Sequence, residues 1–439
     1  MRQQHQRRSD ISIIFIQTKH GYAIGSIVAT YSSNGNRRWN LLTKMSRDRH
    51  HRRPTDWTQT QRACIGAAGM KERFIALYRV RADAASIEAR AAAIAVEQSV
   101  EMPLEAIDAP EVLREVAGRV ETIEDRGGGV FDVGIALAVA TVDGDAGQLL
   151  NMAFGNTSLH DDAVLQDLEL SADLAAQFGG PRHGVAGLRS RARASGRALT
   201  CSAIKPQGLP PARLAELAGR LAAGGLDFVK DDHGLADQRY APFAARVPGC
   251  AAAVRRAGAI TGHPTRYVPN LCGDAPAMRR QVALARDEGL DTVMIAPLLA
   301  GFANVQALVR DFPDMAFIAH PTMGGAARIA PALLIGKLFP LIGADAVIFP
   351  NHGGRFGYSE ATCRRIAATA RAPGPGLRGA LPVPAGGMTL ARVPEMLDFY
   401  GSETMLLIGG SLLAAGERLT ERTTAFTHAV AAHSYGHSS

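Results

Sequence analysis

The feature that most constrains the fold is a regular alternation of short apolar segments and amphipathic segments from Ala198 onward. Apolar runs of strand length are followed by stretches with helical periodicity, which is the pattern of βα units in a parallel sheet. The predicted strands end at Lys205, Lys230, Asn270, Pro297, Pro321, Asn351, Gly387 and Gly410. Eight such units predict a (β/α)8 barrel over residues 191–439, with an open doubly wound sheet as the alternative.

The segment ahead of the barrel, residues 70–190, has a different pattern. An alanine-rich helix is expected from about Ser86 to Val96. Strands are expected at 74–80, 117–125 and 130–141. This mixture predicts an N-terminal α+β domain.

The positive charge of the chain is concentrated near its beginning. The net charge is +7, but residues 1–69 hold 12 Lys and Arg against 3 Asp and Glu, whereas residues 70–439 hold 36 against 38. A body so close to neutral predicts no nucleic-acid-binding face. The basic extension 1–69 is expected to be disordered, or to be upstream sequence ahead of a start at Met70. Binding of a polyanion is the alternative.

The cysteines and the apolar runs of the sequence indicate the cellular compartment of the protein. The five cysteines form no CxxC pair, which argues against a disulfide framework or a structural zinc site. The apolar run 11–16 is too short for a signal-peptide core or a membrane span. We therefore expect a cytoplasmic protein with no membrane partner.

Two lysines stand out because the chain has 42 arginines and only six lysines. Lys205 ends the first predicted barrel strand, and Lys230 ends the second. Lysine can lose its proton and act as a base, a nucleophile or a carbamate, whereas arginine stays protonated. Active sites of barrel enzymes lie at the C-terminal ends of the strands, so these positions predict amine chemistry at the barrel mouth.

The densest polar cluster is Lys230-Asp231-Asp232-His233. Alternate strand residues face the same side, so Lys230 and Asp232 are expected to share a cavity. A carbamate on Lys230 and the Asp232 carboxylate would offer oxygen ligands to a divalent cation such as Mg²⁺. An imidazole suits softer metals, so His233 either binds another divalent cation or is no ligand. A solvated loop is the alternative for the whole cluster.

Further strand ends carry candidate binding groups. Two glycine pairs close the last two strands, where backbone N–H groups can hold a phosphate. These residues are Gly386, Gly387, Gly409 and Gly410. His352 and Arg355 follow the sixth strand and could bind a second anionic group, although Arg355 could equally be a solvated loop charge. His320, at the fifth strand end, is a candidate proton carrier.

Together these motifs resemble the large chain of ribulose bisphosphate carboxylase, the RuBisCO superfamily. The resemblance spans about residues 70–425 and is most specific over Gly224-Gly225-Leu226-Asp227-Phe228-Val229-Lys230-Asp231-Asp232. It implies an α/β fold, in which a ferredoxin-like N-terminal α+β domain precedes a C-terminal TIM barrel.

The resemblance also implies roles for individual residues. Lys205 resembles the lysine that abstracts a proton, Lys230 the lysine that is carbamylated to bind Mg²⁺, and Asp232 a metal ligand. His320 matches the active-site histidine of strand five, and the four glycines match a phosphate cradle. Glu97 and Asn156 fall on segments that complete the barrel of a partner subunit. A homodimer or a higher oligomer of dimers is therefore implied.

Departures from the family pattern exclude carbon dioxide fixation. Carboxylases use a lysine on the loop after strand six, and this chain has no lysine after Lys337. His233 stands where the family has a third metal-binding glutamate, and Pro321 where it has a phosphate-binding arginine. Gln207 and Ala385 replace a lysine and a serine. The chain is identified as similar to the non-carboxylating, type IV RuBisCO-like proteins.

The function implied is enolate chemistry on a phosphorylated sugar derivative. Our leading expectation is a lyase of carbohydrate catabolism that decarboxylates 3-oxo-isoapionate 4-phosphate, or transcarboxylates and hydrolyses it. One alternative is the diketo-thiopentose phosphate enolase of methionine salvage, or a related isomerase. His233 counts against the enolase, which keeps the glutamate. A non-catalytic regulatory homologue is the other alternative.

Overall fold

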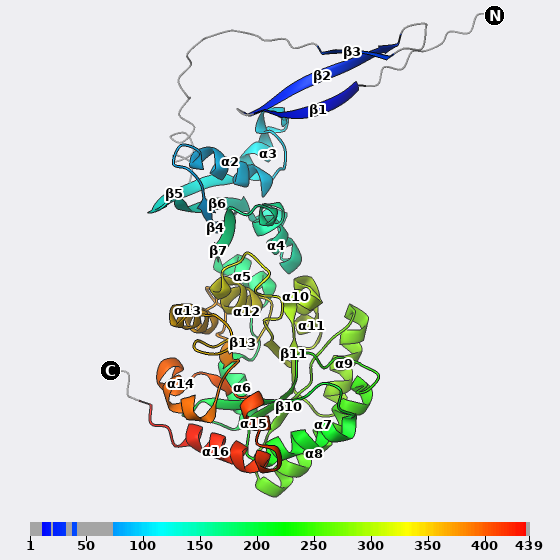
Figure 1. Ribbon diagram of the computed structural model, residues 1–439, viewed down its shortest axis with the longest axis vertical. Coiled ribbons are helices and arrows are strands. Elements are labelled where there is room, and N and C mark those ends of the chain that lie inside the picture. The colour runs from blue at the N-terminus through cyan, green and yellow to red at the C-terminus, as the bar shows by residue number, and fades with distance from the viewer. Residues whose placement is uncertain (1–10, 19–20, 32–36, 42–72, 436–439) are drawn as a thin grey trace, which may run out of the picture. The chain divides into compact units, whose positions relative to one another are not determined.

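The computed structural model describes residues 11–18, 21–31, 37–41 and 73–435, and it divides into two units, residues 1–64 and 65–439. In the first unit, β1 (Ile11–Thr18), β2 (Gly21–Tyr31) and β3 (Arg37–Leu41) form an antiparallel sheet (Figure 1). The extension that we expected to be disordered therefore includes three strands. Its remaining residues, and a start at Met70, lie outside the described residues.

The second unit begins with an α+β domain whose antiparallel sheet has the order β5-β6-β4-β7. Its strands are β4 (Arg73–Arg81), β5 (Arg119–Gly127), β6 (Val130–Ala138) and β7 (Ala163–Glu169). Its helices are α2 (Ile87–Glu97), α3 (Pro110–Glu115) and α4 (Ala146–Phe154), with short 3-10 turns at Leu104–Ala106, Val139–Thr141 and Asn156–Leu159. Alternate residues of β4, among them Phe74 and Tyr78, are buried in the core that the sheet forms with α2 and α4. The predicted α+β domain is confirmed.

Eight parallel strands follow and close into a barrel. They are β8 (Leu199–Ile204), β9 (Phe228–Asp231), β10 (Arg266–Val268), β11 (Thr292–Ile295), β12 (Ala316–Ala319), β13 (Ala346–Pro350), β14 (Leu381–Ala385) and β15 (Met405–Leu407). Strand β15 pairs with β8, and a bridge between Asn270 and Met294 joins β10 to β11. The pairing of the last strand with the first excludes the open doubly wound sheet, so the TIM barrel is confirmed.

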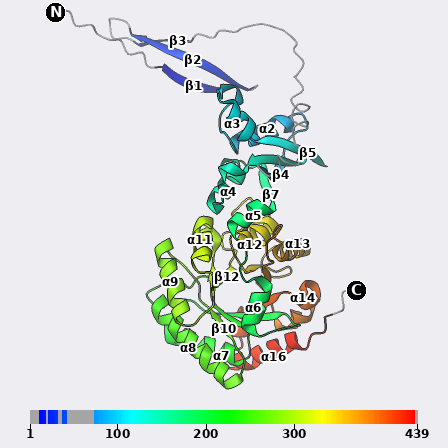
Figure 2. The ribbon, with the colours of Figure 1, turned by 180° about the vertical axis from the view of Figure 1, so that it is seen from behind.

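Helices surround the barrel strands, and Figure 2 shows α7, α8, α9 and α11 on its outside. The longer ones are α5 (Ala172–Phe178), α6 (Gly184–Ala192), α7 (Pro211–Ala223), α8 (Phe243–Thr261), α9 (Ala275–Asp287), α11 (Phe302–Asp311), α13 (Glu360–Arg371), α14 (Val393–Tyr400) and α16 (Leu419–Ala431). Short helices are α10 (Pro297–Ala300), α12 (Phe339–Leu341), α15 (Gly410–Leu413), the π-helical η5 (Ala332–Leu338), and the 3-10 turns Leu390–Arg392 and Gly416–Arg418.

The barrel strands are mostly apolar because both of their faces are buried. In β8, Leu199 and Cys201 pack in the barrel interior with Phe228 and residues of the other strands. Ile204, in contrast, belongs to the core between strands and helices. Strands covered on both faces read as continuous apolar runs, which explains the pattern that the sequence shows from Ala198 onward.

The α+β domain is joined to the barrel by backbone hydrogen bonds. Leu165 N on edge strand β7 donates to Arg328 O at 3.1 Å, and Ala330 N donates to Leu165 O at 2.8 Å. The segment between β12 and η5 thereby adds a short parallel bridge to the β7 edge. The loop that follows His320 is therefore fixed at its far end by the α+β domain.

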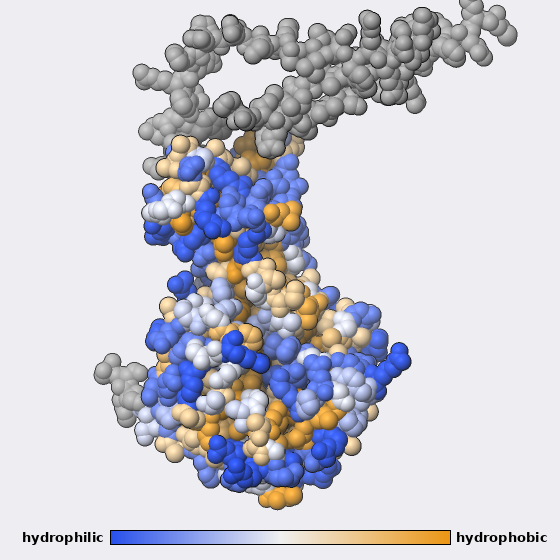
Figure 3. Space-filling view, viewed as in Figure 1, coloured by the Kyte–Doolittle hydropathy of each residue, from blue (hydrophilic) through white to orange (hydrophobic). Residues whose placement is uncertain are grey.

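The surface of residues 73–435 is mixed in character. Figure 3 shows hydrophilic and hydrophobic residues interspersed on the face turned to the viewer. Large exposed apolar side chains include Leu159, Ile260, Leu299, Met323 and Phe356. Within the described ranges, no helix is long and apolar enough to cross a membrane.

Candidate active site

Lys205 and Asp232 form the centre of the candidate site. They follow the neighbouring strands β8 and β9, whose register pairs Ile204 with Asp231. This register brings Lys205 Nζ to 2.6 Å from Asp232 Oδ1. Burial acts to raise the pKa of Asp232, but hydrogen bonds from His233 and Lys205 hold that pKa well below its usual range. Asp232 is therefore a carboxylate that holds the lysine amine in place.

Two histidines stack beside this pair. The rings of His233 and His320 lie 4.3 Å apart between centroids and 7° from parallel. His233 Nδ1 lies 3.3 Å from Asp232 Oδ1, and His320 Nδ1 shares a hydrogen bond with Thr322 Oγ1 at 2.6 Å. Burial, assisted by Lys230 and His233, lowers the pKa of His320 to about 2. His320 is therefore a neutral imidazole at physiological pH, suited to hydrogen bonding rather than to carrying a stored proton.

Lys230 is buried behind Asp232. Its Nζ donates a hydrogen bond to Asp231 O at 2.9 Å. Burial lowers the pKa of Lys230, and Lys205 acts in the same direction. A lowered pKa favours the neutral amine, which is the form of lysine that adds carbon dioxide.

The donor set fits a divalent cation on one condition. Among the described residues, no group of three or more His, Cys, Asp or Glu side chains could hold a metal ion. Asp232 and His233 supply two donors, and a third exists at this strand end only if Lys230 carries a carbamate. Because Lys230 is buried with a lowered pKa, the conditional fit is chemically reasonable.

The two glycine pairs differ in their surroundings. A methyl group built on Gly409 would lie 3.9 Å from Lys205 Cε, and one on Gly410 would meet nothing within 4 Å. Gly386 has φ +83°, and a methyl group there would lie 2.9 Å from the Phe356 ring. Gly387 has φ +82°, and a methyl group there would lie 2.7 Å from Gly354 Cα. The strand-eight pair thus borders Lys205 and open space, whereas the strand-seven pair lies under the loop after β13.

His352 and Arg355 lie in the segment after β13, and both contact aromatic rings. The His352 ring is buried and packs against Phe399 of α14, with 4.6 Å between centroids. The Arg355 guanidinium lies over the Phe356 ring, 5.1 Å from its centroid. Substrate binding by either residue stays a prediction.

Glu97 and Asn156 are brought together within the α+β domain. Asn156 Nδ2 donates to Glu97 Oε1 at 2.8 Å and to Glu101 Oε1 at 2.6 Å. Sequence reasoning missed Glu101, which lies four residues after Glu97 and has φ +53°. It also missed Thr322, the hydrogen-bond partner of His320. The only sequence signal for Thr322 is its hydroxyl group, two residues after the histidine at the strand end.

The most specific sequence motif contains one aspartate that lies away from the candidate site. Asp227 precedes β9, at the opposite end of the barrel strands from Asp232, and its side chain is 0% exposed. Its two carboxylate oxygens accept hydrogen bonds from Arg197 at 2.7 and 2.8 Å, and Oδ2 also accepts from Thr200 N at 2.8 Å. Asp227 therefore ties the beginnings of β8 and β9 together.

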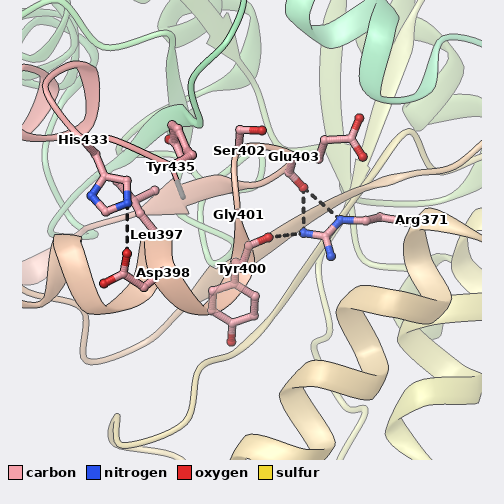
Figure 4. A pocket seen from close by; sticks show the side chains of 9 residues that line it. All are labelled: Arg371, Leu397, Asp398, Tyr400, Gly401, Ser402, Glu403, His433 and Tyr435. Atoms are coloured by element: carbon pink, nitrogen blue, oxygen red, sulfur yellow. Dashed lines mark hydrogen bonds and ion pairs between the residues drawn. The ribbon is translucent and has the colours of Figure 1, made fainter. Parts of the chain in front are cut away.

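A cavity of about 590 Å³ lies elsewhere, where α13, α14 and the C-terminal segment meet (Figure 4). It contains none of the predicted site residues. Arg371 donates to the carbonyl oxygens of Tyr400 and Glu403, and so caps the end of α14 (Figure 4). His433 lies 3.2 Å from Asp398. The Arg371 guanidinium is thus bound by backbone carbonyl groups, whereas His433 Nε2 is buried and makes no hydrogen bond to the residues that the structure describes.

Comparisons with known proteins agree with this architecture. The catalytic domain of the ribulose bisphosphate carboxylase large chain matches residues 184–332. The chain is 61% identical over 363 residues to 5-methylthioribulose-1-phosphate isomerase of Rhodospirillum rubrum, covering 82% of this chain and 97% of the relative. It is 32% identical over 324 residues to 2,3-diketo-5-methylthiopentyl-1-phosphate enolase of Geobacillus thermodenitrificans, covering 69% and 78%.

A solved structure is similar over the same region. The crystal structure of a Rubisco-like protein from Rhodopseudomonas palustris superposes with a TM-score of 0.77 at 49% identity, covering 82% of this chain and 98% of that chain. The barrel, the α+β domain and the extent of these identities lead to one conclusion. The chain belongs to the RuBisCO large-chain family and is a RuBisCO-like protein of the non-carboxylating type.

Proposed function

We propose that the protein is a sugar-phosphate isomerase that acts on 5-methylthioribulose 1-phosphate through an enediolate. The observation that carries this proposal is the 61% identity, over 97% of its length, to a relative named for that reaction. A proton on a carbon next to the ketone is acidic because the carbonyl delocalises the charge that remains. An isomerase of such a ketose must remove that proton and return one to a different atom.

The geometry around Lys205 supports this chemistry. Lys205 would take and return the proton, and Asp232, 2.6 Å away, would hold its amine. Neutral His320 would share a hydrogen bond with a substrate oxygen. The open backbone at Gly409 and Gly410, beside Lys205, would receive the phosphate.

A divalent cation would be held by carbamylated Lys230, Asp232 and His233. It would stabilise the negative charge of the enediolate as a Lewis acid. Mg²⁺ suits the two oxygen donors, and the His233 nitrogen admits softer divalent cations.

Our leading expectation from the sequence, a lyase acting on 3-oxo-isoapionate 4-phosphate, is less well supported than the isomerase alternative. Its support was the shared enolate chemistry, which the isomerase also needs. The relatives are named for 5-methylthioribulose 1-phosphate and 2,3-diketo-5-methylthiopentyl 1-phosphate. Of these two reactions, the isomerase is favoured by the higher identity and by His233 in place of the glutamate.

We further propose a homodimer in which Glu97 and Asn156 of one subunit complete the site of the other. Leu159, three residues after Asn156, is 80% exposed. An exposed leucine beside this polar cluster is suited to burial against a second subunit.

Deuterium exchange tests the proposal directly. Purified protein is incubated with 5-methylthioribulose 1-phosphate in D₂O, and the substrate and product are followed by ¹H and ³¹P NMR. We expect a new sugar phosphate with deuterium on the carbon that receives the proton. Lys205→Met should slow this by about 10²- to 10⁴-fold, the usual contribution of a general base.

Lys337→Met is the matched control, since it removes a lysine paired with Asp167 away from the barrel mouth. Its activity should stay close to that of the wild type. Unchanged activity in Lys205→Met would refute the role of Lys205. No conversion of the methylthio sugar, with release of carbon dioxide from 3-oxo-isoapionate 4-phosphate, would favour the lyase instead.

A further inference from the structure

A fully buried ion pair lies next to the candidate site and includes Asp231, the residue before Asp232. Arg246, in the first turn of α8, and Asp231, at the end of β9, both have side chains that are 0% exposed. Arg246 Nε and Nη2 each lie 3.2 Å from Asp231 Oδ2. Asp231 also accepts hydrogen bonds from Tyr267 OH at 2.6 Å and Asn270 N at 3.0 Å. All the polar atoms of this carboxylate are thus engaged within the protein, so it faces no substrate.

The side chains of Arg246 and Asn270 hold the backbone of the loop 232–241. Arg246 Nη1 donates to Ala236 O at 2.8 Å and to Ala241 O at 2.7 Å. Asn270 Nδ2 donates to His233 O at 3.1 Å and to Leu235 O at 2.8 Å. Four carbonyl groups of one ten-residue loop are therefore bound by two buried side chains.

Burying two charged groups has a large desolvation cost in free energy. An apolar replacement of a buried ion pair is often as stable as the pair or more stable, so the pair is weak evidence of a stability role. What it does provide here is a fixed path for the loop that begins with Asp232 and His233. Catalytic geometry is sensitive to displacements of about 1 Å, which can cost about 100-fold in rate.

We infer that Arg246 and Asn270 are positioning residues, which set the place of the Asp232 carboxylate beside Lys205 by binding the loop 232–241. This inference rests on the proposed function in taking Lys205 as the base. Asp231 is the internal counter-ion of Arg246, not a partner of the substrate. The aspartates at 231 and 232 thus have separate tasks, one holding the loop and the other holding the lysine.

Asn270→Ala tests the inference, because it removes both hydrogen bonds to the loop and leaves the buried ion pair intact. We expect amide hydrogen exchange in residues 233–241 to become faster, as measured by mass spectrometry. The kcat for 5-methylthioribulose 1-phosphate should fall about 10- to 100-fold, as for other residues that orient functional groups, with KM nearly unchanged. If Asn270→Ala does not fold, Tyr267→Phe, which removes one hydroxyl, should give smaller changes of the same sign.

Gln306→Ala is the matched control. Gln306 also fixes a loop through two backbone hydrogen bonds, with Ala146 N at 3.0 Å and Gly144 O at 2.8 Å, but it lies outside the candidate site. Its kcat should match that of the wild type. An equal fall of kcat in both variants would overturn the inference, and so would faster exchange in 233–241 with an unchanged kcat.

A measurement without substrate separates this inference from the proposed function. Acylation of Lys205 by acetic anhydride, followed by mass spectrometry, should be faster in Asn270→Ala because the amine loses its partner. Wild-type protein that leaves the methylthio sugar unchanged would refute the proposed function alone. An unchanged rate of Lys205 acylation in Asn270→Ala would refute the positioning role, whatever the substrate.

Discussion

Substitution of Arg197 by methionine tests whether the Asp227 network is structural. The guanidinium of Arg197 makes the two charge-assisted hydrogen bonds to Asp227, at 2.7 and 2.8 Å. Methionine keeps much of the apolar length of the side chain and removes the charge. The variant therefore leaves a buried carboxylate without its cation.

The size of the effect follows from the burial of each partner. Removing one member of a buried ion pair costs about 3–5 kcal/mol in the free energy of unfolding. Arg197 keeps 23% of its side chain exposed, and Asp227 retains its hydrogen bonds from Thr200. Both facts reduce the loss, so we expect about 3 kcal/mol at pH 7, at the lower end of that range.

The loss should depend on pH with a definite sign. Burial acts to raise the pKa of Asp227, but hydrogen bonds from Arg197 and His263 hold it below its usual range. In the wild type this group therefore stabilises the fold above its unfolded pKa of about 3.9, and the stabilisation is lost as the pH falls. Without Arg197, burial dominates and the folded pKa rises, so stability is lost as the pH rises through it. The difference between wild type and variant should be largest near pH 7, should shrink as the pH falls, and should be smallest below the lowered folded pKa of Asp227.

Urea unfolding followed by far-UV circular dichroism measures this difference. Tryptophan fluorescence is unsuitable because Trp39 and Trp57 both lie in the N-terminal extension. Arg213→Met is the control, since Arg213 forms an exposed pair with Glu216 and should contribute about 0.5 kcal/mol or less. A loss below about 1 kcal/mol for Arg197→Met, or a loss that is the same at pH 4 and pH 7, would refute a charge-based role for the pair.

Two further predictions concern packing and metal preference. Gly224→Ala should destabilise by about 1–3 kcal/mol, because the added methyl would lie 2.5 Å from Thr423 Cβ. Gly249→Ala, in α8 with Ala215 Cβ at an ordinary 3.7 Å, should stabilise by about 0.5–1 kcal/mol. Equal changes in the free energy of unfolding of the two variants, measured by urea unfolding, would contradict these two expectations. His233→Glu adds an oxygen donor and should strengthen Mg²⁺ binding in bicarbonate buffer, as measured by calorimetry. Unchanged Mg²⁺ affinity would argue against a cation at this strand end.

The sequence determined the architecture because barrel strands carry a strong local signal. Their two buried faces give continuous apolar runs, and the helices between them give an amphipathic period. Six of the eight runs end at a polar or glycine residue, and parallel strands bring those ends to one mouth. The place of Lys205 and Lys230 at the ends of neighbouring barrel strands could therefore be predicted from their positions in the sequence alone. The strand alternation also predicted that Lys230 and Asp232 share a side.

Only the tertiary structure decided which of these groups meet. The register of β8 and β9 brings Lys205 to Asp232, and the stacking of His233 on His320 joins residues from strands far apart in the chain. The sequence alone could not distinguish the roles of the three aspartates of one motif. Asp227, Asp231 and Asp232 differ in the partners that distant elements bring to them, namely Arg197, Arg246 and Lys205. Local pattern fixes where a side chain occurs along the chain, but the role of a buried charge depends on its partner, and that partner is set by strand register and helix packing.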